Sequence, residues 1–195
     1  MSGDLYDALR DWQEGIAILL GFLLLILAYL VNGRVVRRRE GERRRNEARA
    51  ILAALYGEIV VLREKVAQVA RLIAEKAGQH AEIGDQFVAE NMPPAPALFE
   101  RLVDKLGLLP AANVLRIVSF YASYEEARSG LRMLAPHSGL SYAATTFLGP
   151  ALMAVQDSEG LLRRMEAEVG AEQAPACDLG DAEAVVEMIE KQYRR

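Results

Sequence analysis

An uncharged stretch near the N-terminus constrains the fold of this chain more than any other feature. Residues 15–31 read GIAILLGFLLLILAYLV, and twelve of these seventeen residues are Leu, Ile, Phe or Val. At roughly −0.3 to −0.6 kcal/mol per residue on a membrane-insertion scale, the twelve contribute on the order of −5 kcal/mol, which is enough for insertion. We therefore expect a single transmembrane helix over residues 15–31.

The length of this predicted span needs support from its flanks. Seventeen residues at ~1.5 Å each give about 25 Å, against a hydrocarbon core of ~30 Å. Trp12 and Tyr29 are placed as interfacial aromatic residues, and Arg34 can extend its side chain to the head groups. A cleaved signal peptide is the alternative, but no positively charged region precedes the stretch and no small-residue cleavage site precedes the arginines.

The charges on the two sides of the stretch predict its orientation. Residues 1–14 hold four acidic side chains and one arginine, whereas residues 34–45 hold seven arginines and two glutamates. Positive residues beside a span stay in the cytoplasm, so we expect the N-terminus outside a bacterial inner membrane and the rest of the chain inside. The arginines also attract anionic lipid, by about 1 kcal/mol each near the surface. The membrane-flanking residues are Trp12, Tyr29, Arg34, Arg37, Arg38, Arg39, Arg43, Arg44 and Arg45.

The remaining 150 residues carry a net negative charge. Residues 46–195 hold 15 basic and 21 acidic side chains, which argues against nucleic acid as the partner of the arginine-rich run. Cys177 is the only cysteine, so an intramolecular disulfide cannot form, as expected in a reducing compartment. We expect a solvated cytoplasmic domain.

A heptad pattern follows the arginines and predicts a long amphipathic helix. Seven apolar residues alternate at spacings of three and four, and a second apolar edge at Ile51, Val61 and Leu72 widens the stripe. The pattern leaves two readings open, because the stripe can be the core of one chain or a seam between two membrane-tethered copies. We expect a hinge at Asn32 and Gly33 between the span and this helix. The stripe residues are Leu52, Leu55, Ile59, Leu62, Val66, Val69 and Ile73.

The rest of the sequence predicts further helices and no strand. Proline-containing loops at residues 91–96 and 136–139 separate the apolar helical patterns. The LGLLP sequence at residues 106–110 predicts a corner, with Gly107 as a left-handed helix cap and Pro110 in the next first turn. We expect an all-α chain with one transmembrane helix and a cytoplasmic bundle of about five helices. The expected parts are an extracytoplasmic N-terminus (1–14), a transmembrane helix (15–31), an Arg-rich juxtamembrane segment (32–45) and a helical domain (46–195).

Residues of the types that usually catalyse reactions or bind metals and cofactors are scarce. His80 and His137 lie in or beside predicted loops and neither has a ligand-spaced partner, and no phosphate-binding glycine motif occurs. We therefore expect no catalytic, cofactor-binding or metal-binding residues. Tyr121, Tyr124 and Glu125 share one predicted helix and allow a pocket between helices, although tyrosines buried at the core edge are the alternative.

The stretch LFERLVDKLGLLPAANVLRIVSFYASYEEA, residues 98–127, carries a resemblance. Its Leu-Gly-Leu-Leu-Pro corner at residues 106–110, followed by Phe120 and Tyr121, resembles uncharacterised small bacterial single-span membrane proteins with a helical cytoplasmic domain. The resemblance covers these thirty residues and the span. It implies the fold and no activity.

Three functional hypotheses remain. The first is a non-catalytic interaction or scaffold domain held at the inner membrane, whose partners are an anionic lipid bilayer and an unknown protein, with a homo-oligomer as an open alternative. The second is a membrane-associated ligand sensor or enzyme that uses the pocket near Tyr121. The third is a membrane effector of a stress or defence system, which the size and layout of the chain allow.

Overall fold

The chain is all-α in the computed structural model. The structure describes residues 3–79, 81, 83–134 and 143–193, and the side chains of residues 3–21, 28, 30, 31, 33–36, 143, 192 and 193 lie outside this description. The described residues form six α-helices and one 3-10 helix and contain no strand, whereas the sequence predicts about five helices after the span. The helices are α1 (Gly3–Gly78), α2 (Asp85–Asn91), α3 (Ala97–Leu102), η1 (Val103–Leu108), α4 (Ala111–Leu134), α5 (Ala143–Val169) and α6 (Gly180–Tyr193).

Two compact units divide the chain, and α1 contributes to both. The N-terminal unit is Met1–Asn46, and the second unit, which we call the bundle, is Glu47–Arg195. The predicted hinge at Asn32 and Gly33 is wrong, because α1 continues through both residues. A glycine in a helix costs only about 1 kcal/mol relative to alanine, and no proline lies nearby to remove a backbone hydrogen bond.

The predicted span lies only partly within the described residues. The backbone of residues 15–31 is helical, but the side chains of residues 15–21, 28, 30 and 31 lie outside the description. Across the part of the chain that the structure describes, no helix has a stretch that is both long and apolar enough to cross a membrane.

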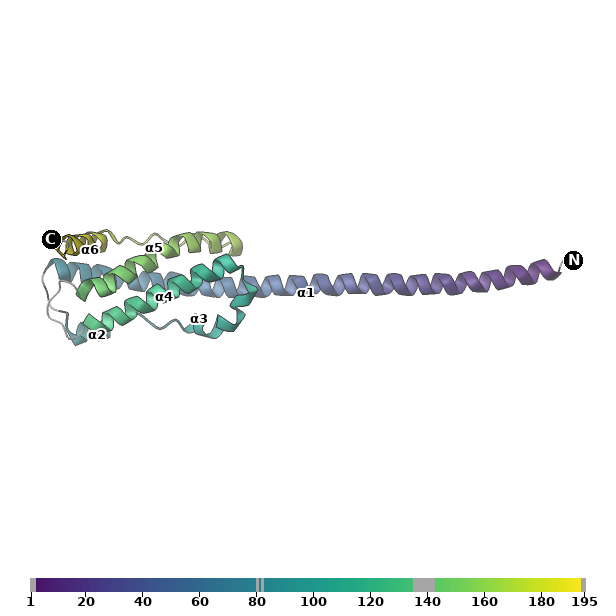
Figure 1. Cartoon of the computed structure of the whole chain (residues 1–195), viewed down its shortest axis with the longest axis horizontal. Coiled ribbons are helices and arrows are strands. Elements are labelled where there is room, and N and C mark those ends of the chain that lie inside the picture. The colour runs from purple at the N-terminus through teal and green to yellow at the C-terminus, as the bar shows by residue number, and fades with distance from the viewer. Residues whose placement is uncertain (1–2, 80, 82, 135–142, 194–195) are drawn as a thin grey trace. The chain divides into compact units, whose positions relative to one another are not determined.

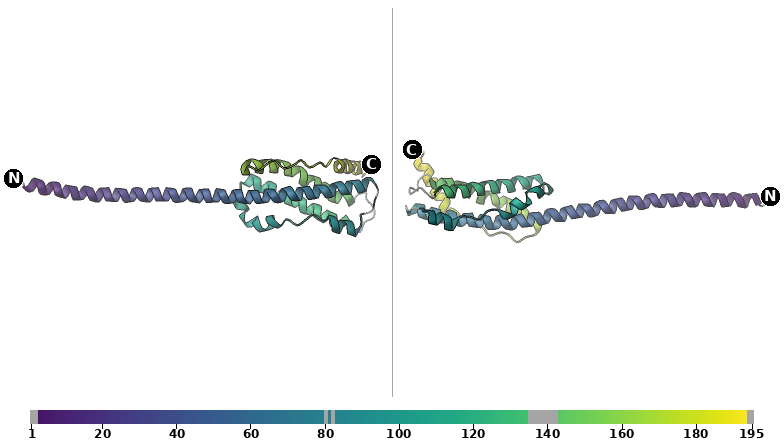
Figure 2. Two further views of the ribbon diagram at one scale, coloured as in Figure 1. Left: turned by 180° about the vertical axis from the view of Figure 1, so that it is seen from behind. Right: turned by 90° about the horizontal axis from the view of Figure 1, so that it is seen from below.

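The apolar stripe of α1 forms the centre of the bundle. All seven heptad residues, from Leu52 to Ile73, are at most 5% exposed within the single chain. In Figures 1 and 2, α5 and α6 lie on one side of this part of α1, and α2 and α3 lie on the other. The stripe therefore packs against the chain's own helices, and pairing of two copies through it would require the bundle to open. Of the second apolar edge, Ile51 is buried, Leu72 is half-buried and Val61 is 56% exposed.

The corner at LGLLP forms by a different local structure from the predicted one. The helix that begins as α3 tightens into the 3-10 helix η1, in which the Leu109 N–H donates to the Leu106 carbonyl over 3.0 Å. Gly107 does not adopt a positive φ. Val103 and Leu108, which would contact each other beside such a cap, are both exposed. The predicted left-handed cap is therefore wrong. Pro110 lies immediately before α4, one residue earlier than the predicted first turn, and its carbonyl accepts the N–H groups of Asn113 and Val114.

Helices α4 and α5 lie in close backbone contact at Gly130. A methyl group on Gly130 would lie 2.2 Å from the carbonyl oxygen of Thr146 and 3.1 Å from the Cα of Phe147. Backbone atoms of α5 therefore occupy the space that any larger residue would need. Helix α5 continues through Gly149 and Pro150 without a break.

Substitution of Gly130 tests this helix contact. We expect Gly130→Ala to destabilise the bundle by about 1–3 kcal/mol, because the added methyl group must push α5 away from α4. Gly57→Ala is the matched control, since Gly57 is an exposed α1 residue at which a methyl group meets nothing within 4 Å. The control should stabilise the helix by about 0.5–1 kcal/mol. Thermal unfolding of the full chain, followed by near-ultraviolet circular dichroism of its tyrosines, measures both effects, and equal stabilities would contradict the contact.

Candidate functional site

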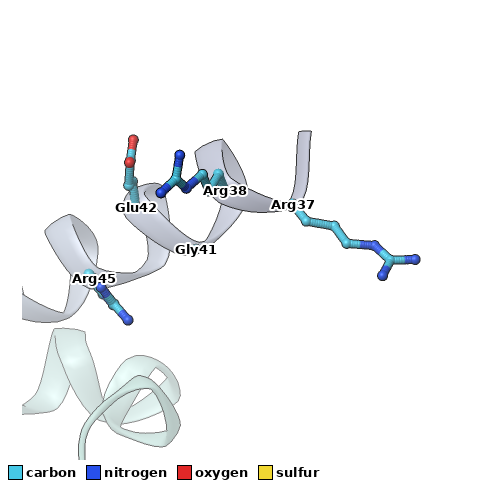
Figure 3. A pocket seen from close by; sticks show the side chains of 5 residues that line it. All are labelled: Arg37, Arg38, Gly41, Glu42 and Arg45. Atoms are coloured by element: carbon cyan, nitrogen blue, oxygen red, sulfur yellow. The ribbon is translucent and has the colours of Figure 1, made fainter. Parts of the chain in front are cut away.

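The described arginines of the basic run lie on an exposed helical surface of the N-terminal unit. An open hollow of about 670 Å³ is lined by Arg37, Arg38, Gly41, Glu42 and Arg45. Figure 3 shows that Arg37 points to one side of the helix and that Arg38 and Glu42 point to another. At about 100° per residue, Arg39 and Arg43 lie on the opposite face. The side chains of Trp12 and Arg34 are outside the description, and Tyr29 is 81% exposed.

Helix α4 holds an extended proline segment, residues 92–96, against the bundle. The Tyr124 hydroxyl donates to the Pro94 carbonyl over 2.6 Å, and Arg128 Nε donates to the Pro93 carbonyl over 3.0 Å. Arg128 Nη1 also contacts both carboxylate oxygens of Glu125, at 2.7 and 2.8 Å. Prolines lack the N–H that would pair this segment internally, so side chains of α4 satisfy its carbonyls.

Glu58 of α1 joins the same region from the other side. Its Oε1 accepts the Leu98 N–H over 2.6 Å, and its Oε2 accepts the Phe99 N–H over 2.9 Å and the Tyr121 hydroxyl over 2.6 Å. The carboxylate thus caps the first turn of α3, where backbone N–H groups have no helical partner. The Phe99 and Tyr121 rings stack at 4.0 Å, which fixes the tyrosine over the cap.

Burial keeps both tyrosine hydroxyls protonated. Desolvation and the hydrogen bond to Glu58 raise the pKa of Tyr121 far above its usual value of about 10. Desolvation also raises the pKa of Tyr124, and the nearby Arg128 guanidinium opposes this shift. Each hydroxyl is therefore protonated at neutral pH and is a hydrogen-bond donor.

The sequence predicts part of this arrangement. It groups Tyr121, Tyr124 and Glu125 as polar residues of one helix, and the structure brings them to the same proline segment. Their polar groups bind the chain itself: Glu58, the Pro94 carbonyl and Arg128 are the partners. Sequence reasoning misses Glu58 and Arg128, although the i, i+3 spacing of Glu125 and Arg128 and the i, i+4 spacing of Tyr124 and Arg128 give a signal for the second.

A second irregular segment, residues 170–179, packs on the opposite edge of α1. Glu166 is 7% exposed, and its Oε1 lies 2.7 Å from the Ala174 N–H and 3.3 Å from the Tyr56 hydroxyl. The same hydroxyl donates to the Glu172 carbonyl over 2.8 Å, and buried Arg63 donates to the Pro175 carbonyl. Desolvation and Glu166 raise the pKa of Tyr56, so its hydroxyl stays a donor.

Cys177 borders a small acidic cleft between this segment and α5. The cleft measures about 360 Å³. Burial raises the pKa of the Cys177 thiol, with the Arg63 charge opposing and Glu64 adding to the shift. The thiol is therefore protonated at neutral pH and is a weak nucleophile. The other lining residues are Val155, Gln156, Glu159, Asp178, Leu179, Gly180 and Glu183.

Metal-ligating residues do not gather in the part of the chain that the structure covers. No group of three or more His, Cys, Asp or Glu side chains there could hold a metal ion. His80 and His137 lie outside the described residues.

No protein-family model, curated protein or solved structure matches the chain.

Removal of one carboxylate oxygen tests the Glu58 cap. Glu58→Gln keeps the side-chain size but offers only one acceptor oxygen to three donors, so we expect a loss of about 2 kcal/mol of stability. Glu64→Gln, on an exposed face of the same helix, should change stability by less than about 0.5 kcal/mol. Hydrogen exchange at the Leu98 and Phe99 amides should accelerate only in the first variant. Unchanged exchange at both amides would contradict the cap.

Proposed function

We propose that the chain is a single-pass bacterial inner-membrane protein with its N-terminus outside, and that the bundle is a non-catalytic interaction or scaffold domain on the cytoplasmic side. The membrane anchor is the stretch 15–31 and the stop-transfer signal is the run 34–45. Exposed apolar side chains on the helix of the N-terminal unit carry this proposal.

These side chains face every direction around the helix. Residues 22–27 are six consecutive large apolar residues with exposed fractions between 43% and 70%. At about 100° per residue they cover the full circumference, so no protein surface within the unit shields any face. Apolar area left in water costs about 25 cal/mol per Å², and lipid is the environment that removes this cost from all faces at once.

The neighbouring charges support the direction of insertion. Four acidic residues precede the stretch and seven arginines follow it. An arginine at the membrane centre costs about 2.5–3.5 kcal/mol on the insertion scale, so the run resists translocation.

The bundle offers an exposed apolar stripe that suits a protein partner. Leu115 is 74% exposed and Val118 is 45% exposed on α4. The exposed residues Ala111 and Ala122 extend the row by four residues at each end, so the spacings along it are four, three and four. This α4 stripe, Ala111, Leu115, Val118 and Ala122, has the heptad spacing of a helix-packing surface. A partner or a second copy would use this stripe, because the stripe of α1 is already covered.

The pocket hypothesis receives less support. Tyr121, Tyr124 and Glu125 use their polar groups to hold the proline segment and the cap of α3, and these contacts explain their positions without a ligand. No observation bears on the hypothesis of a stress or defence effector.

Membrane anchoring is tested by a pair of charge insertions. Leu24→Arg with Leu25→Arg adds roughly 5–7 kcal/mol to the free energy of membrane insertion. This cost offsets the insertion free energy of about −5 kcal/mol. We expect this variant to leave the membrane fraction on alkaline extraction, while the unaltered chain remains. Leu115→Arg with Val118→Arg adds the same charge at exposed bundle positions and should remain in the membrane. A reporter active only in the periplasm, fused to the C-terminus, should be inactive, and strong activity there would contradict the orientation.

The scaffold role is tested with the same bundle variant. A short bifunctional cross-linker applied to native membranes should give a discrete product of higher mass with the unaltered chain, and Leu115→Arg with Val118→Arg should abolish it. Met153→Arg with Met188→Arg alters exposed residues of α5 and α6 and should keep the product. If only Met153→Arg with Met188→Arg abolished the cross-linked product, the interface would lie on α5 and α6 and not on the α4 stripe. Absence of the product from the unaltered chain would contradict the scaffold role.

A further inference from the structure

Gly41 sits at a position of α1 where the chain itself has no need of a glycine. A glycine inside a helix costs about 1 kcal/mol relative to alanine. A methyl group at Gly41 would meet nothing within 4 Å, so no close backbone contact of the kind seen at Gly130 requires it. The missing side chain instead leaves free space in the hollow that Arg37, Arg38 and Arg45 border.

The three arginines are neighbours of Gly41 on the surface of the helix. Arg37 and Arg45 lie four residues before and after Gly41, and Arg38 lies three residues before it, so all three are its neighbours on the helix surface. Helical side chains lean toward the N-terminus, which brings Arg45 over the turn that contains Gly41. Figure 3 shows Arg37 pointing away from Gly41, in a different direction from Arg38 and Arg45, so Arg38 and Arg45 are the two that can share a ligand there.

Charge in the hollow is positive and uncompensated. Among the described residues, Arg37, Arg38 and Arg45 form no ion pair, whereas Arg44 pairs with Glu40 over 3.4 Å. Glu42 also borders the hollow, so the three arginines and this carboxylate leave a net charge of +2. A phosphate ester is the anion that guanidinium groups bind with two parallel hydrogen bonds.

We propose that the hollow over Gly41 binds the phosphate of an anionic phospholipid head group, held by Arg38 and Arg45. This inference rests on the proposed membrane anchor. Gly41 follows the end of the predicted span by ten residues, or about 15 Å of helix. The span is about 5 Å shorter than the hydrocarbon core, and the head-group layer adds roughly 5–8 Å, so arginines that lean back toward the span reach that layer.

A specific phosphate-binding site at Gly41, which we call the Gly41 seat, differs from general attraction between basic residues and an anionic surface. General attraction depends on the number of positive charges and little on their position around the helix. A seat requires the arginines on the Gly41 face and the space above the glycine. Arg39 and Arg43, on the opposite face, supply the matched comparison.

The test titrates the full chain in neutral detergent with short-chain phosphatidylglycerol and follows binding by calorimetry. We expect Arg38→Gln with Arg45→Gln to weaken binding on the order of tenfold or more, and Arg39→Gln with Arg43→Gln to weaken it less than about threefold. Gly41→Leu fills the space without changing charge and should match the first pair. Asn46→Leu alters an exposed residue of the same helix and should leave binding unchanged.

Three results would overturn the proposal. Equal weakening by the two arginine pairs would mean general attraction, and unchanged binding by Gly41→Leu would mean that the space is not used. Equal binding of inorganic phosphate or of phosphatidylcholine would remove the assignment to an anionic lipid. The titration does not depend on membrane insertion. Loss of the unaltered chain from membranes on alkaline extraction would therefore contradict the anchor alone. If the chain stays in the membrane but Gly41→Leu does not change lipid binding, only the site at Gly41 is contradicted.

Discussion

Burial of the apolar stripe on α1 is the constraint on which the rest of the bundle depends. A single helix cannot cover its own stripe, so α4, α5 and the shorter helices must pack around it. Polar residues on the two edges of the stripe then hold the irregular segments. Glu58, on one edge, caps α3, whereas Tyr56 and Arg63, on the other, bind the segment 170–179. One helix therefore supplies both the core and the contacts that position the loops over it.

The sequence predicts this core well because the signal is local. Alternate spacings of three and four place every stripe residue on one face, and all seven are buried. The second edge is predicted less well: Val61 has the same chemistry as Val66 but is 56% exposed, because burial depends on whether another helix lies over the position. Periodicity gives the direction in which a side chain points, and the neighbouring elements decide whether anything covers it.

The features that the sequence does not predict depend on distant residues or on small energy differences. The partners of Glu58 are 40 and 63 residues away along the chain, so no local pattern links them. At LGLLP, a left-handed cap and a 3-10 turn both satisfy the last carbonyl groups of a helix. At Asn32 and Gly33, a cost of about 1 kcal/mol for the glycine is too small to interrupt the helix.

The two parts of α1 place different demands on the same residue type. Leu52, Leu55 and Leu62 are covered by the helices of the bundle, whereas the leucines of residues 22–27 have no protein cover within their unit. On the proposed function, lipid covers the second group, and the arginines that follow set the depth. Each arginine drawn into the hydrocarbon would cost about 2.5–3.5 kcal/mol, so on this proposal the hydrocarbon boundary falls before the basic run 34–45. On the proposed function, the basic run fixes how far the helix enters the bilayer through its total charge, and the phosphate site proposed at Gly41 selects the head group that lies beside it.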